Sequence, residues 1–353
     1  MTISRPIGSQ GRKSPGLFRH AGVRAGIALL GYAAIAVLAW RAIDHDRFSE
    51  GLGRLSGTDV LLILGVALLH IAGRALRYHW LVLRSRPGRE YRWLDGVRIF
   101  LVGLSSSAVT PARAGDLVKA QLIRRYGISL QAGLGLVMVE RMLDLLVIVA
   151  SIVVTGLWLS GSAESEAWRG AAVVLLLALI AGVVALSAKR IRTPILGGLA
   201  RIVSGIRKQH DRATVLVASL EEAFHVWDAI FVSPARLVRY VVYSATVWGV
   251  EFMKLWLVLR LIHVPVDTSI ALFVYPVSIV AGILSIVPFS EGVVGVTGVA
   301  LLVKLAGVDA GSATVGVVVD RAASSLPPLL LWALFAAFGG AKQTPPDARS
   351  SPH

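Results

Sequence analysis

Long apolar runs, separated by short basic connections, are the main pattern along this chain. A helix needs about 20 mostly apolar residues to cross a bilayer, and flanking Arg or Trp side chains can extend a shorter run by reaching toward the surface. The pattern predicts six membrane-spanning helices, at about residues 25–43, 58–83, 132–159, 170–188, 238–260 and 313–339.

Two further apolar segments, 97–125 and 269–306, are interrupted in the middle by Pro and Gly. Irregular backbone at membrane depth is tolerated only where it is buried in protein or lines a wet cavity. We therefore expect each segment to form a re-entrant helical hairpin. The expected fold class is an all-α polytopic membrane protein, with about six full transmembrane helices and two re-entrant helical hairpins arranged as two inverted-topology repeats.

The composition agrees with a membrane protein. Of the 353 residues, 55% are hydrophobic and 16% are charged, whereas soluble domains carry about 25% charged residues. The net charge of +15 would favour nucleic-acid binding in a soluble protein. Here a membrane topology explains the charges, so no nucleic-acid partner is expected. The sequence contains no cysteine, which excludes disulfides and thiol chemistry.

Lys and Arg gather in three connections, 84–98, 113–125 and 189–212, whereas 160–169 contains a single Arg. Six crossings and two hairpins place all three basic connections on one side, together with both termini. The positive-inside rule makes that side cytoplasmic, and the membrane is expected to be the cell (inner) membrane. Residues 160–169 and 261–268 are then expected outside.

The same topology divides the chain into segments. The first apolar run is expected to remain as an uncleaved span, because Arg41 and not a small-residue cleavage site follows it. The expected segments are a basic cytoplasmic tail (1–24), a single transmembrane domain (25–340) with repeats at about 25–160 and 170–340, a cytoplasmic amphipathic helix (195–231), and a disordered tail (341–353).

Four landmarks of the first half recur in the second half in the same order. They are Trp80-Leu81-Val82-Leu83-Arg84 with Trp256-Leu257-Val258-Leu259-Arg260, Pro111 with Pro288, Gly115 with Gly292, and Glu140-Arg141 with Asp320-Arg321. An odd number of crossings in each half would invert the second half. Inverted repeats with discontinuous helices are typical of secondary transporters, whose substrate site lies near the midplane between the repeats. The alternative is a duplicated structural bundle that transports nothing.

Charged residues inside the predicted spans are candidates for chemistry, because each costs about 2.5–3.5 kcal/mol to insert. Glu140, Arg141 and Asp144 share one helix face, and Asp320 and Arg321 repeat the arrangement. Arginine stays charged and forks onto phosphate. The alternative is an intrahelical ion pair that holds helices together.

Two other spans also carry charged faces. His70, Arg74 and Arg77 lie on one face of the second span, and Glu251 and Lys254 lie on one face of the fifth. For Arg77 and Lys254 we expect snorkelling or helix pairing rather than substrate binding.

The hairpin breaks add polar groups that can bind a headgroup. The candidate substrate-binding residues are Ser106, Pro111, Arg113, Asp116, Glu140, Arg141, Asp144, Ser290, Glu291, Asp320 and Arg321. Each arginine needs a counter-charge. The candidates are Asp116 or Asp144 for Arg141, and Glu291 or Asp320 for Arg321. No metal-ligand spacing or Ser-His pair is evident, so no catalytic residue, cofactor or metal is expected.

The first-half motifs resemble those of a known family. Leu104-Ser105-Ser106-Ser107-Ala108-Val109-Thr110-Pro111-Ala112-Arg113-Ala114-Gly115-Asp116, followed by Glu140-Arg141-Met142-Leu143-Asp144, is similar to the lysylphosphatidylglycerol synthase transmembrane region, also called the flippase-like domain family. The family also has a second, glycine-rich motif that ends in a glutamate. At the corresponding positions this chain has Val293 instead of a glycine and Gly298 instead of the glutamate, and Glu291 is the acid nearby. The resemblance implies movement of a lipid or lipid-linked sugar, often alongside glycosyltransferases or aminoacyl-lipid synthases.

Three functions remain open from the sequence. The leading hypothesis is a translocase for an anionic lipid or lipid-linked precursor, whose headgroup binds between the two hairpins. Its expected partners are membrane lipids. The second is a non-transporting membrane partner of a glycosyltransferase or lipid synthase. The third is an intramembrane enzyme that acts on lipid phosphates.

Overall fold

The computed structural model describes residues 45–85, 87–109, 115–159, 163–187, 193–194, 197–198, 220–222, 224–231, 233–285 and 290–339. The chain divides into two units, residues 1–42 and 43–353, and all described residues belong to the second. The predicted first span (25–43), both predicted tails and most of the predicted amphipathic helix (195–231) lie outside the described residues.

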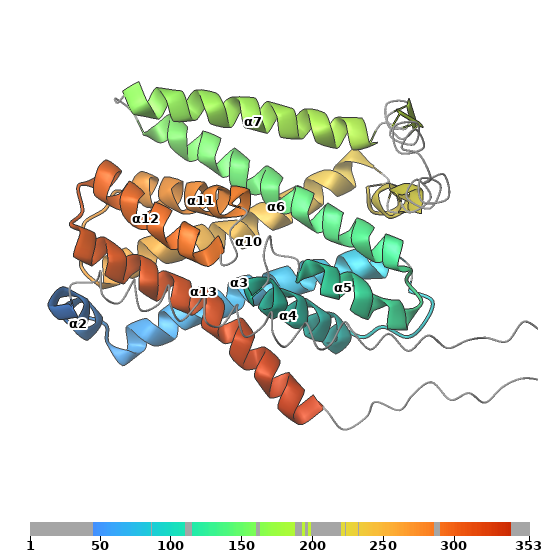
Figure 1. Ribbon diagram of the computed structural model, residues 1–353, viewed down its shortest axis with the longest axis horizontal. Coiled ribbons are helices and arrows are strands. Elements are labelled where there is room, and N and C mark those ends of the chain that lie inside the picture. Colours follow the sequence, from blue (N-terminus) through green and yellow to red (C-terminus); the bar gives the residue numbers. More distant parts are fainter. Residues whose placement is uncertain are drawn as a thin grey trace, which may run out of the picture. The chain divides into compact units, whose positions relative to one another are not determined.

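Every element that the structure describes is a helix, which confirms the predicted all-α class. The elements are α2 (His45–Gly53), α3 (Gly57–Arg84), α4 (Trp93–Val109), α5 (Asp116–Leu122), η2 (Ile123–Tyr126), α6 (Leu130–Trp158), α7 (Ala163–Ser187), α10 (Pro234–Leu261), α11 (Thr268–Leu284), α12 (Ser290–Ala306) and α13 (Ala310–Gly339). Figure 1 shows them as one bundle of crossing helices.

Membrane-spanning helices are part of this bundle. In the described part of the chain, three helices are long and apolar enough to cross a bilayer: Gly57–Arg84, Pro234–Leu261 and Ala310–Leu331. Shorter apolar helices occur at Val173–Ala185 and Thr268–Leu284. The chain is therefore a membrane protein, while the count of six spans and the re-entrant hairpins stay predictions.

Polar residues determine where several helices begin and end. Ser56 and Asp59 form a capping box at α3, where the Ser56 hydroxyl accepts from Asp59 N at 3.2 Å and the Asp59 carboxylate accepts from Ser56 N at 2.9 Å. The Ser129 hydroxyl accepts from Ala132 N at 3.0 Å at the start of α6. Gly127, with φ of 79°, ends η2 in the left-handed conformation that glycine adopts most easily.

The two halves contain helices of matching length in the same order. Helices α3 and α10 each have 28 residues, and α4 and α11 each have 17. The long helices α6 and α13 have 29 and 30 residues. The half-helices after the breaks differ, because α5 has 7 residues and α12 has 17. These lengths support the predicted duplication.

Helices α3 and α10 run antiparallel. Near one end the rings of Trp80 and Tyr243 lie 5.0 Å apart, and in the middle His70 Nδ1 lies 2.9 Å from Glu251 Oε2. At the other end Arg54, just before α3, donates to the carbonyl of Ile262, just after α10, at 3.1 Å. We refer to the two ends of the pair as the Arg84 end and the Arg54 end.

The segment from α4 to η2 leaves the Arg84 end and returns to it. Arg89 N, before α4, donates to Tyr126 O at 3.2 Å, and the Tyr91 and Tyr126 rings lie 5.1 Å apart. Gly115 allows the return, because a Cβ there would lie 2.1 Å from the backbone nitrogen of Ser107. The chain thus folds back on itself closely at this break.

The segment from α11 to α12 makes the corresponding excursion from the Arg54 end. It starts shortly after Ile262 and leads through 307–309 into α13. The first turns of α13 lie at that end, since Val315 contacts Gly51 of α2. In Figure 1 the α11–α12 pair lies toward the left of the bundle and the α4–α5 pair toward the right.

The helices before and after each break form a hairpin, α4–α5 in the first half and α11–α12 in the second. Each hairpin packs against the long helix of the other half, α13 or α6. Helix α4 packs on α13, and α11 packs on α6. The Ser105 hydroxyl of α4 donates to the Pro328 carbonyl of α13 at 3.2 Å. The space enclosed where these helices meet contains the candidate site.

Candidate functional site

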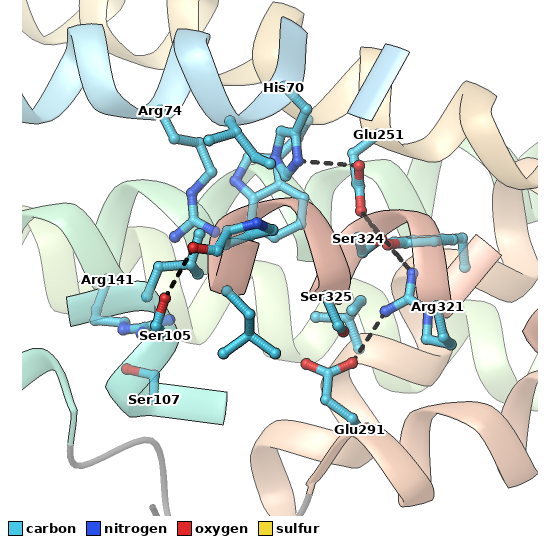
Figure 2. A pocket seen from close by; sticks show the side chains of 17 residues that line it. His70, Arg74, Ser105, Ser107, Arg141, Glu251, Glu291, Arg321, Ser324 and Ser325 are labelled. Atoms are coloured by element: carbon cyan, nitrogen blue, oxygen red, sulfur yellow. Dashed lines mark hydrogen bonds and ion pairs between the residues drawn. The ribbon is translucent and has the colours of Figure 1, made fainter. Parts of the chain in front are cut away.

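A cavity of about 80 Å³ lies between the two halves. This is room for several water molecules. Among the described residues, its wall is formed by side chains from α3, α4, α6, α10, α11, α12 and α13. They are His70, Ile71, Arg74, Leu104, Ser105, Ser107, Arg141, Trp248, Glu251, Tyr275, Ile279, Glu291, Arg321, Ser324, Ser325, Pro328 and Leu329, and Figure 2 shows them as sticks.

Two arginines at equivalent positions face this cavity. Arg141 and Arg321 each lie eleven residues after the first residue of their helices, α6 and α13. Their side chains are 28% and 13% exposed, so both are accessible from the cavity but largely enclosed by protein. Figure 2 shows Arg74 and Arg141 on one side of the cavity and Arg321 on the other. The cavity wall therefore presents cations from both halves.

Arg141 is restrained by an acid from the first hairpin. Asp116, the first residue of α5, forms an ion pair with Arg141 and lies 2.8 Å from Lys119 Nζ. Lys119 is fully buried and also lies 2.5 Å from Glu140 Oε2. The first hairpin thus supplies Asp116 as the partner of Arg141, and Lys119 as the partner of Glu140, the residue before Arg141.

Asp144 binds α3 and α10 rather than its own helix. Its carboxylate accepts from Arg77 Nη2 at 2.5 Å and from Trp248 Nε1 at 2.8 Å, and it lies 3.5 Å from Arg74 Nη2. Asp144 thus links three helices, which agrees with the part of the structural alternative in which the acids of α6 hold helices together.

Arg321 has the corresponding arrangement in the second half. It donates to Asp320 Oδ2 at 2.6 Å, lies 3.4 Å from Glu291 Oε2 of the second hairpin, and contacts the Tyr275 hydroxyl. Its guanidinium carbon also lies 4.5 Å from the Tyr275 ring centroid. As in the first half, an acid of the hairpin faces the cavity arginine, whereas the neighbouring acid Asp320 contacts Arg321 itself and Glu140 contacts Lys119.

Lys254 is the buried base of the second half. Its ammonium lies 2.9 Å from Glu251 Oε1 and 3.5 Å from Asp320 Oδ1, and it donates to the Ser324 hydroxyl. Tyr275 donates to Glu251 Oε1 at 2.6 Å. These contacts fix α10, α11 and α13 around Arg321.

His70 of the first half pairs with Glu251 of the second half across the cavity wall. Its Nδ1 lies 2.9 Å from Glu251 Oε2. Its Nε2 is buried and has no hydrogen-bond partner among the described residues. A buried polar atom without a partner is costly and marks a place where water or a ligand can bind.

Pro327 and Pro328 interrupt the hydrogen-bond ladder of α13 beside the cavity. Proline has no N–H, so this pair removes the helical donors for the carbonyls of Ala323 and Ser324. The side chains of Ser324, Ser325 and Pro328 line the cavity at this point. The two adjacent prolines are a signal in the sequence from which this interruption could have been predicted.

The predicted site residues occupy two layers. Arg141, Glu291 and Arg321 line the cavity. Four predicted acids are buried behind them, namely Asp116, Glu140, Asp144 and Asp320. Of the two acids predicted as alternatives for Arg141, Asp116 forms the ion pair, and both alternatives for Arg321, Glu291 and Asp320, contact it. Ser106 does not line the cavity, whereas its neighbours Ser105 and Ser107 do. Pro111, Arg113 and the side chain of Ser290 lie outside the described residues.

Several cavity residues were not among the predicted site residues, chiefly His70, Arg74, Trp248, Glu251, Tyr275 and Ser324. Arg77 and Lys254 are fully buried, so snorkelling is wrong for them and helix pairing is correct. Arg77 pairs with α6 and also donates to Ser244 of α10 at 2.8 Å. No cluster of three or more metal-ligating side chains occurs in the part of the chain that the structure describes.

Comparison with known proteins gives one family. The model of a family described as the lysylphosphatidylglycerol synthase TM region matches residues 25–331. No curated protein matches the chain.

Proposed function

The chain belongs to the lysylphosphatidylglycerol synthase transmembrane-region family, and on this basis we propose that it is a flippase-like translocase for an anionic lipid or lipid-linked precursor. The lipid headgroup would bind in the central cavity between the α4–α5 and α11–α12 hairpins. The protein would act in the cell membrane, with both termini in the cytoplasm.

The observation that supports this proposal most strongly is the pair Arg141 and Arg321. They come from equivalent positions of two related helices and face one cavity. A guanidinium group presents two parallel N–H donors that match phosphate oxygens. A structural ion pair needs only one arginine and one acid, whereas two converging arginines suit a shared anionic ligand.

The partners of these arginines suggest how a headgroup is bound and released. Asp116 and Glu291 each begin or nearly begin a half-helix after a hairpin break and hold the cavity arginine when no lipid is bound. An incoming phosphate would compete with these carboxylates. Binding would thereby loosen a hairpin from its long helix, and release would restore the contact.

The arrangement of the hairpins supports alternating access. The first leaves and re-enters the Arg84 end, and the second leaves and re-enters the Arg54 end. In an inverted repeat the two hairpins enter the bilayer from opposite sides, with the substrate site between them. Loosening one hairpin would open the cavity toward one leaflet while the other hairpin stays closed.

Reconstitution into liposomes tests this proposal. A fluorescent phosphatidylglycerol analogue is placed in both leaflets, and a membrane-impermeant quencher reports how fast inner-leaflet lipid becomes accessible. Arg141→Gln and Arg321→Gln should each lower the protein-dependent rate about tenfold or more, because each removes a charge-assisted contact to phosphate. Exposed Arg125→Gln is the matched control and should keep the rate.

Full activity in both cavity variants would contradict the proposed headgroup site. A wild-type chain that moves neither this analogue nor a lipid-linked anion would instead favour the alternative function, a membrane partner that holds a glycosyltransferase or lipid synthase.

A further inference from the structure

A second hollow, separate from the central cavity, lies at the Arg84 end between α3 and α10. Its volume is about 490 Å³, and it is lined by Trp80, Leu83, Arg84, Arg236, Arg239, Tyr240 and Tyr243. It shares no lining residue with the central cavity. We call it the arginine–tyrosine hollow.

The hollow has an excess of positive charge. Among the residues that the structure describes, three guanidinium groups line it and no acid does. Among the described residues, none of these three arginines forms an ion pair with a carboxylate. Arg236 Nη1 donates instead to the Ala229 carbonyl, at 3.4 Å. This contrasts with the central cavity, where Arg141 and Arg321 each have an acid.

The aromatic side chains give the hollow a fixed wall. The Tyr243 hydroxyl donates to the Gly73 carbonyl at 2.9 Å, and its ring lies 5.0 Å from that of Trp80. Trp80 remains 39% exposed and Leu83 remains 44% exposed. Trp and Tyr in such positions are typical of the membrane–water interface, where one part of the ring is apolar and the other is hydrated.

The position along the helices also indicates the interface. Arg84 is the last residue of one candidate span, and Arg236 is the third residue of another. Both therefore lie where a spanning helix leaves the hydrocarbon and meets the phosphate groups of the lipids. Basic pockets between transmembrane helices on the cytoplasmic side are suited to anionic headgroups.

We propose that the arginine–tyrosine hollow binds the phosphate of an anionic membrane lipid, as a site distinct from the one used for translocation. Arg84, Arg236 and Arg239 contact the phosphate oxygens, and the tyrosine hydroxyls and Trp80 contact the glycerol region. The exposed side chain of Leu83 faces the first part of an acyl chain. The lipid would join α3 to α10, one helix from each half, at the membrane surface.

Lipid binding by the purified full chain tests this proposal. Native mass spectrometry in detergent counts bound phosphatidylglycerol, with phosphatidylcholine as the zwitterionic comparison. The triple variant Arg84→Gln, Arg236→Gln, Arg239→Gln should bind one phosphatidylglycerol fewer, with an affinity at that site lowered about tenfold or more. The matched control is Arg89→Gln, Arg124→Gln, Arg125→Gln, which removes the same charge from exposed positions outside the hollow. It should keep the site.

Two further variants separate the possible causes. Arg239→Gln alone changes an exposed side chain, so it should fold normally and still weaken the site measurably. Arg141→Gln changes the central cavity and should leave lipid binding in the arginine–tyrosine hollow intact. The two proposals can therefore fail independently of each other. Equal loss in the control triple variant would overturn the proposal in favour of non-specific charge attraction. Equal binding of phosphatidylcholine would overturn the anionic assignment. Occupancy by inorganic phosphate without phosphatidylglycerol binding would assign the site to a soluble anion instead of a lipid.

Discussion

Lys119 Nζ of α5 lies 2.5 Å from Glu140 Oε2 of α6, and both side chains are almost completely buried. The second half repeats the relationship between Lys254 and Asp320, at 3.5 Å, but takes its lysine from α10 instead of the hairpin. The first hairpin is therefore tied into the buried charge network by its own lysine. The ion pair stabilises the position of α5 against α6.

Breaking this pair on one side should destabilise the protein. Lys119→Met leaves Glu140 without its nearest cation, and Glu140→Gln leaves Lys119 with Asp116 alone. Removing one partner of a buried pair costs about 3–5 kcal/mol, whereas replacing both is often nearly neutral. Each single variant should lower the melting temperature in detergent, and the double variant should recover more than half of the loss. If the double variant instead lost the sum of the two single decreases in melting temperature, Lys119 and Glu140 would not stabilise each other.

Asp116→Asn should remove translocation while the protein still inserts and purifies. The amide keeps the shape of the side chain and an acceptor oxygen, but it cannot neutralise Arg141 and Lys119. Liposome translocation measures the loss, and the melting temperature controls for folding. Glu50→Gln, at an exposed carboxylate paired with Arg54 far from the cavity, is the control and should be active. A well-folded Asp116→Asn protein with full activity would make Asp116 a structural residue.

Gly115→Ala should impair folding more than Gly292→Ala. Gly115 has helical dihedral angles, so alanine is acceptable to the backbone, but its Cβ would overlap the backbone of Ser106 and Ser107. Overpacking of this kind costs about 1–3 kcal/mol or more, because backbone atoms must move. A Cβ on Gly292 meets nothing within 4 Å among the residues that the structure describes. The yield of monodisperse protein and its melting temperature compare the two variants.

The predicted topology can be measured by cysteine labelling, because the chain has no native cysteine. Glu164→Cys should react with an impermeant maleimide from outside the cell. Arg125→Cys should react only after the membrane is opened, because the positive-inside rule places it in the cytoplasm. Labelling of position 164 from the cytoplasm alone would overturn this orientation, including the cytoplasmic position expected for residues 84–98 beside the arginine–tyrosine hollow.

The sequence predicted the helices and their breaks well, because both depend on local signals. Apolar length located α3, α10 and α13, and the Pro/Gly interruptions marked the ends of α4 and α11. The repeated Glu-Arg and Asp-Arg pairs located the cavity arginines. The first span and both hairpin tips (110–114 and 286–289) are not covered by the described residues, so these predictions stay open.

Contacts between the halves could not be predicted in the same way. Nothing local indicates that Asp144 meets Trp248, or that His70 meets Glu251, because these pairs depend on how α3, α6 and α10 cross. Helical periodicity showed which face each charge occupies, but not which neighbouring helix that face meets. Near the first break, the helix register places Ser105 and Ser107, the two neighbours of the predicted Ser106, on the cavity wall.

The ionised side chains near the cavity also bear on assembly. In the first half, the ion pairs within α3–α6 join four cations to three carboxylates, namely Arg74, Arg77, Lys119 and Arg141 with Asp116, Glu140 and Asp144. In the second half, those within α10–α13 join two cations to three carboxylates, namely Lys254 and Arg321 with Glu251, Asp320 and Glu291. Buried polar groups also pair across the two halves, because His70 lies 2.9 Å from Glu251 and Trp248 donates to Asp144 at 2.8 Å. Each half alone would leave these groups without their partners inside the bilayer. Two fragments severed between α7 and α10 should therefore be unstable when produced separately and should recombine when produced together.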